Sequence, residues 1–235
     1  LHGLTLAYGR RVLLRDADAV LPQGSITALI GRNGTGKSTL LRAIAGLGTA
    51  AGEIRLCGKP LAALTALQRA STVSFVTTER VRIPNLRCED VVALGRAPYT
   101  NWIGRVQEQD KAIVERSLEL VGMAAFAGKT MDRMSDGECQ RVMIARALAQ
   151  DTPIILLDEP TNNLDLASVV WLEDFLMDYD GTVLVVSHDR YFLNNVCTHI
   201  VDIDYGKIKM YVGNYDFWYE SSQLMQKLVK DQNKR

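Results

Sequence analysis

The segment 31–39, GRNGTGKST, places glycine, lysine and hydroxyl residues at a spacing that suits the binding of a phosphate chain. Glycines let the backbone curl so that amide N–H groups converge on phosphate oxygens, and a following helix adds its positive end. Lys37 would contact the β- and γ-phosphates, and Ser38 would offer its hydroxyl to Mg²⁺. A chance glycine-rich turn is the competing interpretation. The expected phosphate-binding residues are Gly31, Asn33, Gly34, Gly36, Lys37, Ser38 and Thr39.

Two adjacent carboxylates, Asp158 and Glu159, follow the short apolar run 154–157. Such a run indicates a buried strand, and carboxylates avoid burial unless a cation or hydrogen bonds compensate them. Ligands of open parallel sheets bind beyond the carboxyl ends of the strands, where these acids would lie. We expect Asp158 to complete a Mg²⁺ shell through water, and Glu159 to orient or deprotonate an attacking water. The alternative is a solvated pair in a strand-to-loop turn.

The elements that position these residues alternate between strand and helix, which predicts a mainly parallel sheet with helices on both faces. The strand 26–30 precedes the glycine-rich segment, and 38–45 is apolar at helical spacing. A helical block at about 85–135 interrupts the alternation and predicts an inserted lobe. Further strands are expected at 72–76, 154–157 and 181–189, helices at 108–122, 138–150 and 169–179, hairpins at 52–61 and 199–213, and a helical tail at about 217–235.

The composition is that of an ordinary globular protein, with 47% hydrophobic and 23% charged residues. Lysine plus arginine equals aspartate plus glutamate at 27 each, so net charge gives no argument for a nucleic acid or anionic membrane as partner. No apolar run has the length of a membrane span, and no charged-then-apolar leader opens the chain. The four cysteines stand apart, which favours a reduced, cytosolic protein. Because Leu1 opens the chain, we expect a trimmed N-terminus.

The chain resembles an ATP-binding-cassette (ABC) ATPase over essentially its whole length. The resemblance rests on five segments in order: GRNGTGKST, MSDGECQ (134–140), IILLDEPT (154–161), NNLD (162–165) and VVSHD (185–189). MSDGECQ matches the family's signature, usually L-S-G-G-Q, and is the most discriminating segment because a phosphate cradle fits many NTPases. The resemblance implies an α/β P-loop NTPase core with a mainly parallel sheet, an N-terminal antiparallel β subdomain and a helical lobe. It also implies hydrolysis of ATP with Mg²⁺.

Five residues outside the cradle and the acid pair take roles from the resemblance. Ser135 and Gly137 would bind the γ-phosphate held in the cradle of another copy. Asp165 would couple the two sites of a dimer, and His188 matches the switch histidine near the γ-phosphate. Tyr8 matches the aromatic residue that stacks on adenine, and an ordinary strand tyrosine is the alternative.

Two positions depart from the family pattern. Asp136 replaces the commoner glycine of the signature. A glutamine that normally follows the strand at 72–76, and joins the metal site to the helical lobe, is missing. Thr78 stands nearest that place, with Glu79 beside it, so the coupling residue would be one of these two.

The resemblance changes character near Pro160. Up to that residue the chain is most similar to ATPases of iron-siderophore, haem and cobalamin importers, and 88–110 falls in the lobe where a permease docks. Residues 161–220, with SHDRYFL and Y-x-G-N-Y-D, are similar to the first cassette of ABC-F translation factors. We expect an importer ATPase. The alternatives are a fragment of an ABC-F ribosome-associated ATPase and a chimaeric ABC ATPase without a native partner.

The importer reading has consequences for assembly and location. Residues 1–235 would form a single ABC ATPase domain that pairs as a homodimer when ATP binds. Integral-membrane permease subunits would dock on it, and direct binding of nucleic acid is not expected. The protein would lie in the cytoplasm, at the inner face of the cell membrane.

Overall fold

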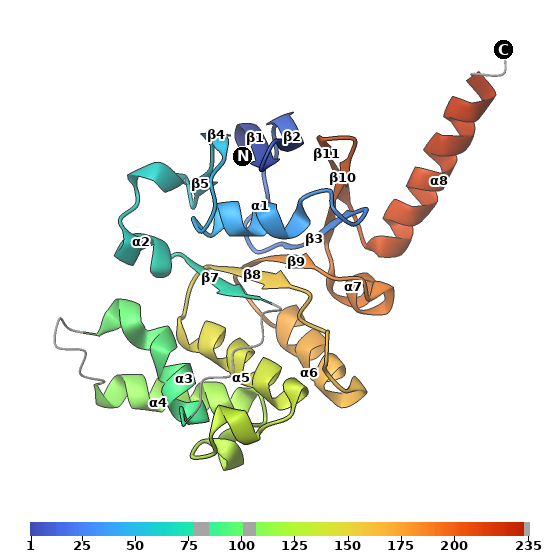
Figure 1. The fold of residues 1–235 in the computed structure, drawn as a ribbon. Coiled ribbons are helices and arrows are strands. Elements are labelled where there is room, and N and C mark those ends of the chain that lie inside the picture. Colours follow the sequence, from blue (N-terminus) through green and yellow to red (C-terminus); the bar gives the residue numbers. More distant parts are fainter. Residues whose placement is uncertain (78–84, 101–106, 233–235) are drawn as a thin grey trace.

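The computed structural model describes residues 1–77, 85–100 and 107–232, and for 225–232 it describes the helical backbone alone. A six-stranded sheet forms the centre of the fold (Figure 1). Its strands are β3 (Ile26–Gly31), β7 (Val73–Val76), β8 (Ile154–Asp158), β9 (Thr182–Val186), β10 (His199–Asp204) and β11 (Lys207–Val212). Their order is β11-β10-β3-β9-β8-β7, and every pair is parallel except β10 with β11. The predicted mainly parallel sheet is confirmed.

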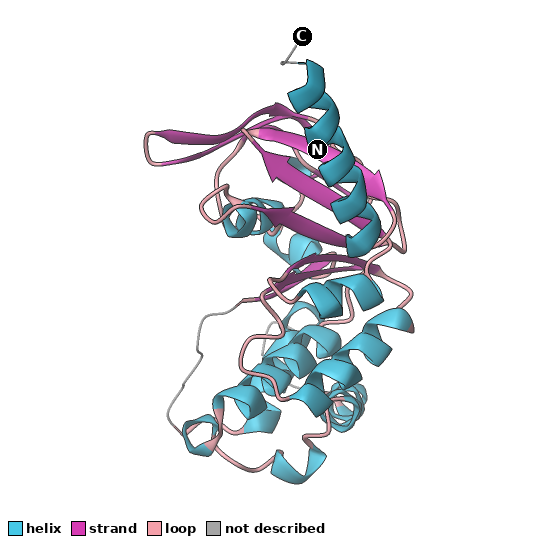
Figure 2. Cartoon of the chain, turned by 90° about the vertical axis from the view of Figure 1, so that its right-hand side faces the viewer, coloured by secondary structure: helices cyan, strands magenta, loops and turns pink. Residues whose placement is uncertain are grey.

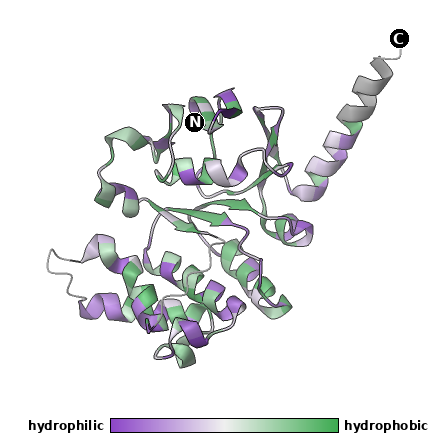
Figure 3. Ribbon diagram, viewed as in Figure 1, coloured by the Kyte–Doolittle hydropathy of each residue, from purple (hydrophilic) through white to green (hydrophobic). Residues whose placement is uncertain are grey.

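The central strands are buried on both faces, and each face packs against a different part of the chain. In β9, Val183 and Val185 point into a core shared with the helical lobe, whereas Leu184 and Val186 point into a core shared with the N-terminal strands. Side chains alternate across a strand, so burial on both faces requires a continuous apolar run. Figure 3 shows this run as an unbroken hydrophobic band through β8 and β9.

An antiparallel subdomain covers one face of the sheet, as expected. It consists of β1 (His2–Tyr8), β2 (Arg11–Ala17) and β4 (Ala51–Glu53) in the order β2-β1-β4. Helix α1 (Lys37–Ile44) lies between this subdomain and the central sheet (Figure 1). The short elements that follow are the hairpin β5 (Arg55–Leu56) and β6 (Lys59–Pro60), the 3-10 helix η1 (Leu61–Ala63) and α2 (Ala66–Ala70).

Helices gather on the opposite side of the sheet (Figure 2). The predicted helical block contains α3 (Cys88–Ala93), the 3-10 helix η2 (Leu94–Tyr99) and α4 (Glu108–Leu120). All three pack against α5 (Asp136–Ala149), so the lobe and the core share one apolar interior. The remaining elements on this side are η3 (Ala124–Phe126), η4 (Met131–Arg133), α6 (Leu166–Met177) and α7 (Arg190–Val196).

Two helices begin earlier than predicted because a side chain caps each of them. The Ser135 hydroxyl accepts from the backbone N–H of Glu138, and the Glu138 carboxylate accepts from the N–H of Ser135 at 2.7 Å. This reciprocal cap starts α5 at Asp136 instead of 138. The Asp165 carboxylate accepts from the N–H of Ser168 at 2.8 Å and starts α6 at Leu166 instead of 169.

The C-terminal segment forms a hairpin and then a helix. Tyr205 and Gly206 both have positive φ, 48° and 75°, the backbone that a tight two-residue hairpin turn demands. The predicted turn at Gly206 is therefore confirmed. Helix α8 (Tyr215–Gln232) begins two residues before the predicted tail and extends away from the body (Figure 1). Among the described residues, no helix combines the length and apolarity needed to cross a membrane.

Leu156 tests whether β8 is stabilised by the core that it shares with the N-terminal strands. Its side chain is 1% exposed, so Leu156→Ala would remove buried methyl groups and leave a cavity. We expect a loss of about 2–5 kcal/mol in the free energy of unfolding, measured by urea denaturation with an unchanged m value. Leu166→Ala, at a position 79% exposed, is the matched control and should change stability by less than about 0.5 kcal/mol. Equal effects of the two variants would contradict the assigned core.

Candidate functional site

The loop from Gly31 to Lys37 joins β3 to α1, in the strand-loop-helix context that the glycine-rich pattern requires. Gly36 has a φ of 101°, a conformation that residues with side chains rarely adopt. A Cβ atom at Gly36 would lie 2.9 Å from Cδ1 of Leu13, and one at Gly31 would lie 2.6 Å from the carbonyl oxygen of Ile203. The positive φ values and the lack of room for a Cβ atom both require glycine at these two positions. With no side chains there, backbone atoms of the loop can contact a ligand directly.

The Lys37 side chain folds back over this loop. Its Nζ donates to the carbonyl oxygens of Gly31 at 2.9 Å and Arg32 at 3.1 Å. Burial lowers the pKa of Lys37, and the nearby carboxylates of Glu159 and Asp158 oppose that shift. An ammonium group has three donors, and these contacts use two of them. The charge is therefore held over the loop with donor capacity remaining for an anion.

Ser38 and Asp158 meet directly, although 120 residues separate them in sequence. The Ser38 hydroxyl donates to Oδ1 of Asp158 at 3.1 Å. Asp158 is 6% exposed at the end of β8. Burial raises the pKa of this carboxyl, and the hydrogen bond from Ser38 opposes the rise. The buried acid thus lies against the cradle, as the strand-end argument predicted.

Glu159 faces His188 across the edge of the sheet. Oε1 of Glu159 is 3.2 Å from Nε2 of His188, and Oε2 accepts from the backbone N–H of His188 at 3.1 Å. The Glu159 backbone has a φ of 49° and donates its N–H to the carbonyl oxygen of Val186 at 2.8 Å. A positive φ is uncommon for such a residue and marks a conformation that the surroundings impose. Two contacts therefore fix the carboxylate beside the histidine.

A polar cavity of about 380 Å³ opens at this edge, between the cradle and the start of α8. It is lined by Gly31, Lys37 and His188, which sequence patterns identified, and by Arg190 and Trp218, which they did not. Arg190 directly follows the VVSHD segment, so its place beside the site could have been predicted from the sequence. No sequence pattern predicted Trp218 as a site residue, because only the packing of α8 brings it to the cavity.

The signature residues lie against the loop that leads to α6. A Cβ atom at Gly137 would lie 2.6 Å from the backbone carbonyl oxygen of Asn163, so the two backbones approach as closely as glycine allows. Ser135 and Asp165 cap the two neighbouring helices, α5 and α6. The structure thus brings Ser135, Gly137 and Asp165 into one surface region.

This region does not meet the cradle within the chain. Helix α1 packs against β1, β3 and β8, whereas α5 packs against α3, α4 and β7 on the other side of the sheet (Figure 1). The phosphate cradle and the signature therefore form two separate surfaces.

The remaining predicted residues are placed as follows. Tyr8 ends β1, opposite Arg11, and its side chain is 75% exposed, which leaves the ring free to stack. Asn33 is exposed in the cradle loop, and Thr39 is half-buried in α1. Thr78 and Glu79, proposed for the missing glutamine, lie outside the described residues.

A model of the ABC transporter family matches residues 14–162. The chain is 38% identical to the iron(3+)-hydroxamate import ATP-binding protein FhuC of Bacillus subtilis, over 79% of this chain and 71% of that protein. It is 36% identical to the petrobactin import ATP-binding protein FpuD of Bacillus anthracis, over 85% of this chain and 74% of that protein. A third relative, an ABC transporter ATP-binding protein of Bacillus subtilis, is 36% identical over 100% of this chain, which spans only 47% of it.

Solved structures share the fold. A dimeric ATP-binding cassette in a post-hydrolysis state, bound to ADP and Pi, matches with a TM-score of 0.76 over 90% of this chain and 97% of that one, at 24% identity. A nucleotide-free cassette from an ABC transporter matches with a TM-score of 0.78 over 94% and 93%, at 18% identity. The expected fold class, an α/β P-loop NTPase core with an antiparallel β subdomain and a helical lobe, is confirmed.

Lys37→Ala removes the ammonium group from the cradle. Charged hydrogen bonds of this kind contribute about 1.5–3 kcal/mol each, so we expect ATP affinity to fall by at least about tenfold while the fold is retained. Isothermal titration calorimetry measures the affinity, and circular dichroism checks the fold. Lys59→Ala removes an exposed lysine from β6 and should bind ATP like the parent chain. An unchanged affinity of Lys37→Ala would show that ATP binds elsewhere.

Gly137→Ala tests the close approach of the signature to the 162–165 loop. The added methyl group would collide with the carbonyl oxygen of Asn163 and push the two segments apart. We expect ATP turnover to fall roughly 10–100-fold, because small misplacements of catalytic groups have effects of that size, while affinity at the cradle is kept. Gly128→Ala is the control, since no atom lies within 4 Å of a Cβ atom there. Wild-type turnover in Gly137→Ala would argue against a role for this contact.

Proposed function

The chain belongs to the family of ABC transporter ATP-binding proteins, and on that premise we propose that it is the ATP-hydrolysing subunit of an iron-siderophore-type importer. The observation that carries the proposal is one edge of the sheet, where Lys37 and Ser38 follow β3, Asp158 and Glu159 follow β8, and His188 follows β9. These groups supply a phosphate contact, metal ligands, a base and a hydrogen-bonding switch at one place.

The oxygen atoms of Ser38 and Asp158 suit Mg²⁺. The Ser38 hydroxyl would bind the ion, and Asp158, which accepts a hydrogen bond from that hydroxyl, would complete the shell through water. Both are hard oxygen donors, the class that Mg²⁺ prefers. When bound there with ATP, the ion supplies positive charge that stabilises the transferred phosphoryl group.

Residues of the chain itself would bind the phosphates, activate the attacking water and hold the adenine. Lys37 would exchange one of its carbonyl contacts for the β- and γ-phosphate oxygens and offset their charge. Glu159, held by His188, would orient the attacking water and accept its proton. His188 is 63% exposed in its side chain and would donate to the γ-phosphate. Tyr8, exposed at the tip of β1, would stack on adenine.

We propose that a complete site needs two copies. The cradle and the signature belong to different elements of one chain and do not meet there, so the signature of one copy would cover the cradle of the other. A C₂ homodimer with two equivalent ATP molecules is the simplest closed arrangement. Each ATP would bind the dimer better than the monomer and shift the population toward it. The dimeric cassette that shares this fold supports the proposal.

The names of the relatives support the importer type. FhuC and FpuD are both named import ATP-binding proteins, one for iron(3+)-hydroxamate and one for petrobactin. Under this proposal an integral-membrane permease docks on the helical lobe, and the chain lies in the cytoplasm at the inner face of the membrane. The segment 88–110 would provide that docking surface; its described residues lie in α3, η2 and the first turn of α4, and 101–106 lie outside the described residues.

A second candidate function, a ribosome-associated ATPase of the ABC-F type, rests on residues 161–220. The relative matched over the whole chain is about twice as long, a length that accommodates a second cassette. Copurification of ribosomes, and not of a membrane permease, from a cell lysate would favour this function.

That the chain is a hybrid of two parent sequences, joined near Pro160, also stays a prediction. Such a join is physically compatible with the fold, since β8 before it pairs with β9 after it in register.

Glu159→Gln tests the composite site. The variant keeps the size and hydrogen bonding of the side chain but removes the base, so ATP should still bind while turnover falls steeply. ATP that is not hydrolysed would hold two chains together. We expect the variant with ATP and Mg²⁺ to sediment as a dimer, and the nucleotide-free chain to sediment mainly as a monomer.

Two comparisons complete this experiment. ADP in place of ATP should leave the variant monomeric, because the γ-phosphate bridges the copies. A Glu159→Gln protein that binds ATP and remains monomeric would contradict the two-copy site. Turnover near that of the parent chain would assign the base elsewhere, with His188 the next residue to test.

A further inference from the structure

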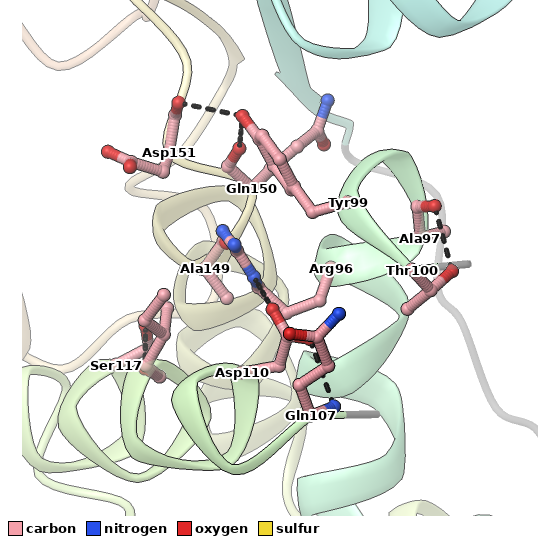
Figure 4. Close-up of polar contacts among 11 residues, drawn as sticks. Arg96, Ala97, Tyr99, Thr100, Gln107, Asp110, Ser117, Ala149, Gln150 and Asp151 are labelled. Carbon is pink, nitrogen blue, oxygen red and sulfur yellow. Dashed lines mark hydrogen bonds and ion pairs between the residues drawn. The ribbon is translucent and has the colours of Figure 1, made fainter. Parts of the chain in front are cut away.

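The C-terminal end of α5 is held by side chains from η2, in a cluster that the proposed mechanism does not use (Figure 4). Nη1 of Arg96 donates to the carbonyl oxygen of Ala149 at 2.8 Å. The Tyr99 hydroxyl lies 2.9 Å from the carbonyl oxygen of Gln150 and 3.1 Å from that of Asp151. The last carbonyls of a helix have no partner within the helix, and here the lobe supplies their donors. We call Arg96, Tyr99 and Asp110, with these three carbonyls, the α5 clamp.

A buried ion pair fixes Arg96 in the clamp. Nε of Arg96 donates to Oδ1 of Asp110 at 2.8 Å, and the two side chains are 8% and 6% exposed. The other carboxylate oxygen of Asp110 accepts from the backbone N–H of Gln107 at 3.1 Å. The Arg96 guanidinium holds the pKa of Asp110 below its usual range, so the pair is charged at neutral pH. The guanidinium carbon also lies 4.0 Å from the centre of the Tyr99 ring.

The clamped end of α5 is also tied to the central sheet. Nε2 of Gln150 donates to the carbonyl oxygen of Ala70 at 2.6 Å and to that of Val73, the first residue of β7, at 3.0 Å. Asp151 has a φ of 52° and turns the chain toward β8, which begins at Ile154. The clamp therefore lies where the lobe, the edge strand β7 and the start of β8 meet.

Helix α5 connects the clamp to the signature. It has 14 residues, which corresponds to a rod about 21 Å long. Ser135 caps its other end, where Gly137 lies against the backbone carbonyl oxygen of Asn163. A small rotation of the rod at the clamp would displace Ser135 by a larger amount. In the opposite direction, β8 runs from the clamp to Asp158.

We propose that Arg96 and Tyr99 are positioning residues, which hold α5 at the angle at which Ser135 of one copy meets the cradle of the other. The inference rests on the proposed two-copy site, but it does not depend on the transported substrate. Under the importer proposal the clamp also links the surface where a permease docks to the angle of the signature, because Arg96 and Tyr99 lie in η2.

The chemistry of the clamp favours positioning over stabilisation. A buried ion pair contributes little net stability compared with apolar side chains of the same volume, but it demands a defined geometry from both partners. Tyr99 is 37% exposed, so its hydroxyl could be solvated as well as bonded to α5. Two donor groups of one 3-10 helix, Nη1 of Arg96 and the Tyr99 hydroxyl, meet three successive carbonyls and so fix the direction of the α5 axis at this end.

The test uses variants that avoid an unpaired buried charge, made in the Glu159→Gln chain. Tyr99→Phe removes one hydroxyl, and the double variant Arg96→Met with Asp110→Leu replaces the ion pair by apolar side chains. Thr100→Val is the matched control, since that hydroxyl donates to Ala97 within its own turn. Calorimetry below the dimerisation concentration measures ATP affinity of the monomer, sedimentation with ATP and Mg²⁺ measures dimerisation, and urea denaturation measures stability.

We expect both clamp variants to bind ATP like the parent and to dimerise more weakly. The loss should be about two- to tenfold for Tyr99→Phe, the range of one hydrogen bond, and larger for the double variant. With Glu159 restored, kcat should fall while the monomer's ATP affinity is unchanged. Clamp variants that dimerise like the parent, whether or not stability falls, would overturn the proposal. Failure of the Glu159→Gln parent itself to dimerise would instead contradict the two-copy site.

Discussion

The parallel pairing of β9 with both β3 and β8 is the constraint on which the site depends. Parallel strands end at the same edge, so this pairing places Lys37, Glu159 and His188 together although they are far apart in sequence. The pairing is possible because these strands are apolar on both faces and are covered by two separate cores. A polar residue in the middle of β8 or β9 would disturb one of those cores before it touched the chemistry. The polar groups lie just beyond the carboxyl ends of the strands, because the strands themselves are buried between the two cores and cannot contact a ligand.

Placing charge at this edge carries a cost that local contacts offset. Asp158 is buried and its pKa is raised, yet Ser38 donates to it and the Lys37 ammonium is near. Glu159 adopts an unfavourable positive φ, and hydrogen bonds with Val186 and His188 hold it there. A shifted pKa and a positive φ are both typical of functional sites, where the fold holds charged groups in place before a charged ligand binds. A Mg²⁺ ion and a phosphate chain would complete the set of opposite charges.

The signature surface, which forms the second half of the proposed site, is positioned by helices and not by strand pairing. Ser135 and Asp165 cap α5 and α6, so their positions follow the axes of those helices. Gly137 permits the close contact with Asn163 that keeps the two helix starts together. At the other end of α5, Arg96 and Tyr99 bind its carbonyl groups. The cradle is thus fixed by strand pairing, and the signature by the ends of a helix.

Sequence alone determined the cradle, the strand that ends in two acids, the alternation of strands and helices, and the family, because these features are local patterns of residue type and spacing. It placed the starts of α5 and α6 two and three residues late, although Ser135 with Glu138 is a readable capping pattern. Only the tertiary structure decided which groups meet. The hydrogen bond from Ser38 to Asp158 spans 120 residues, and the Arg96–Asp110 pair joins two helical elements. The contact between Gly137 and Asn163 joins the first turn of α5 to the loop before α6. No local pattern encodes such contacts, because they arise from packing of the whole chain, where burial removes water and makes each polar group depend on the partner that the fold brings to it.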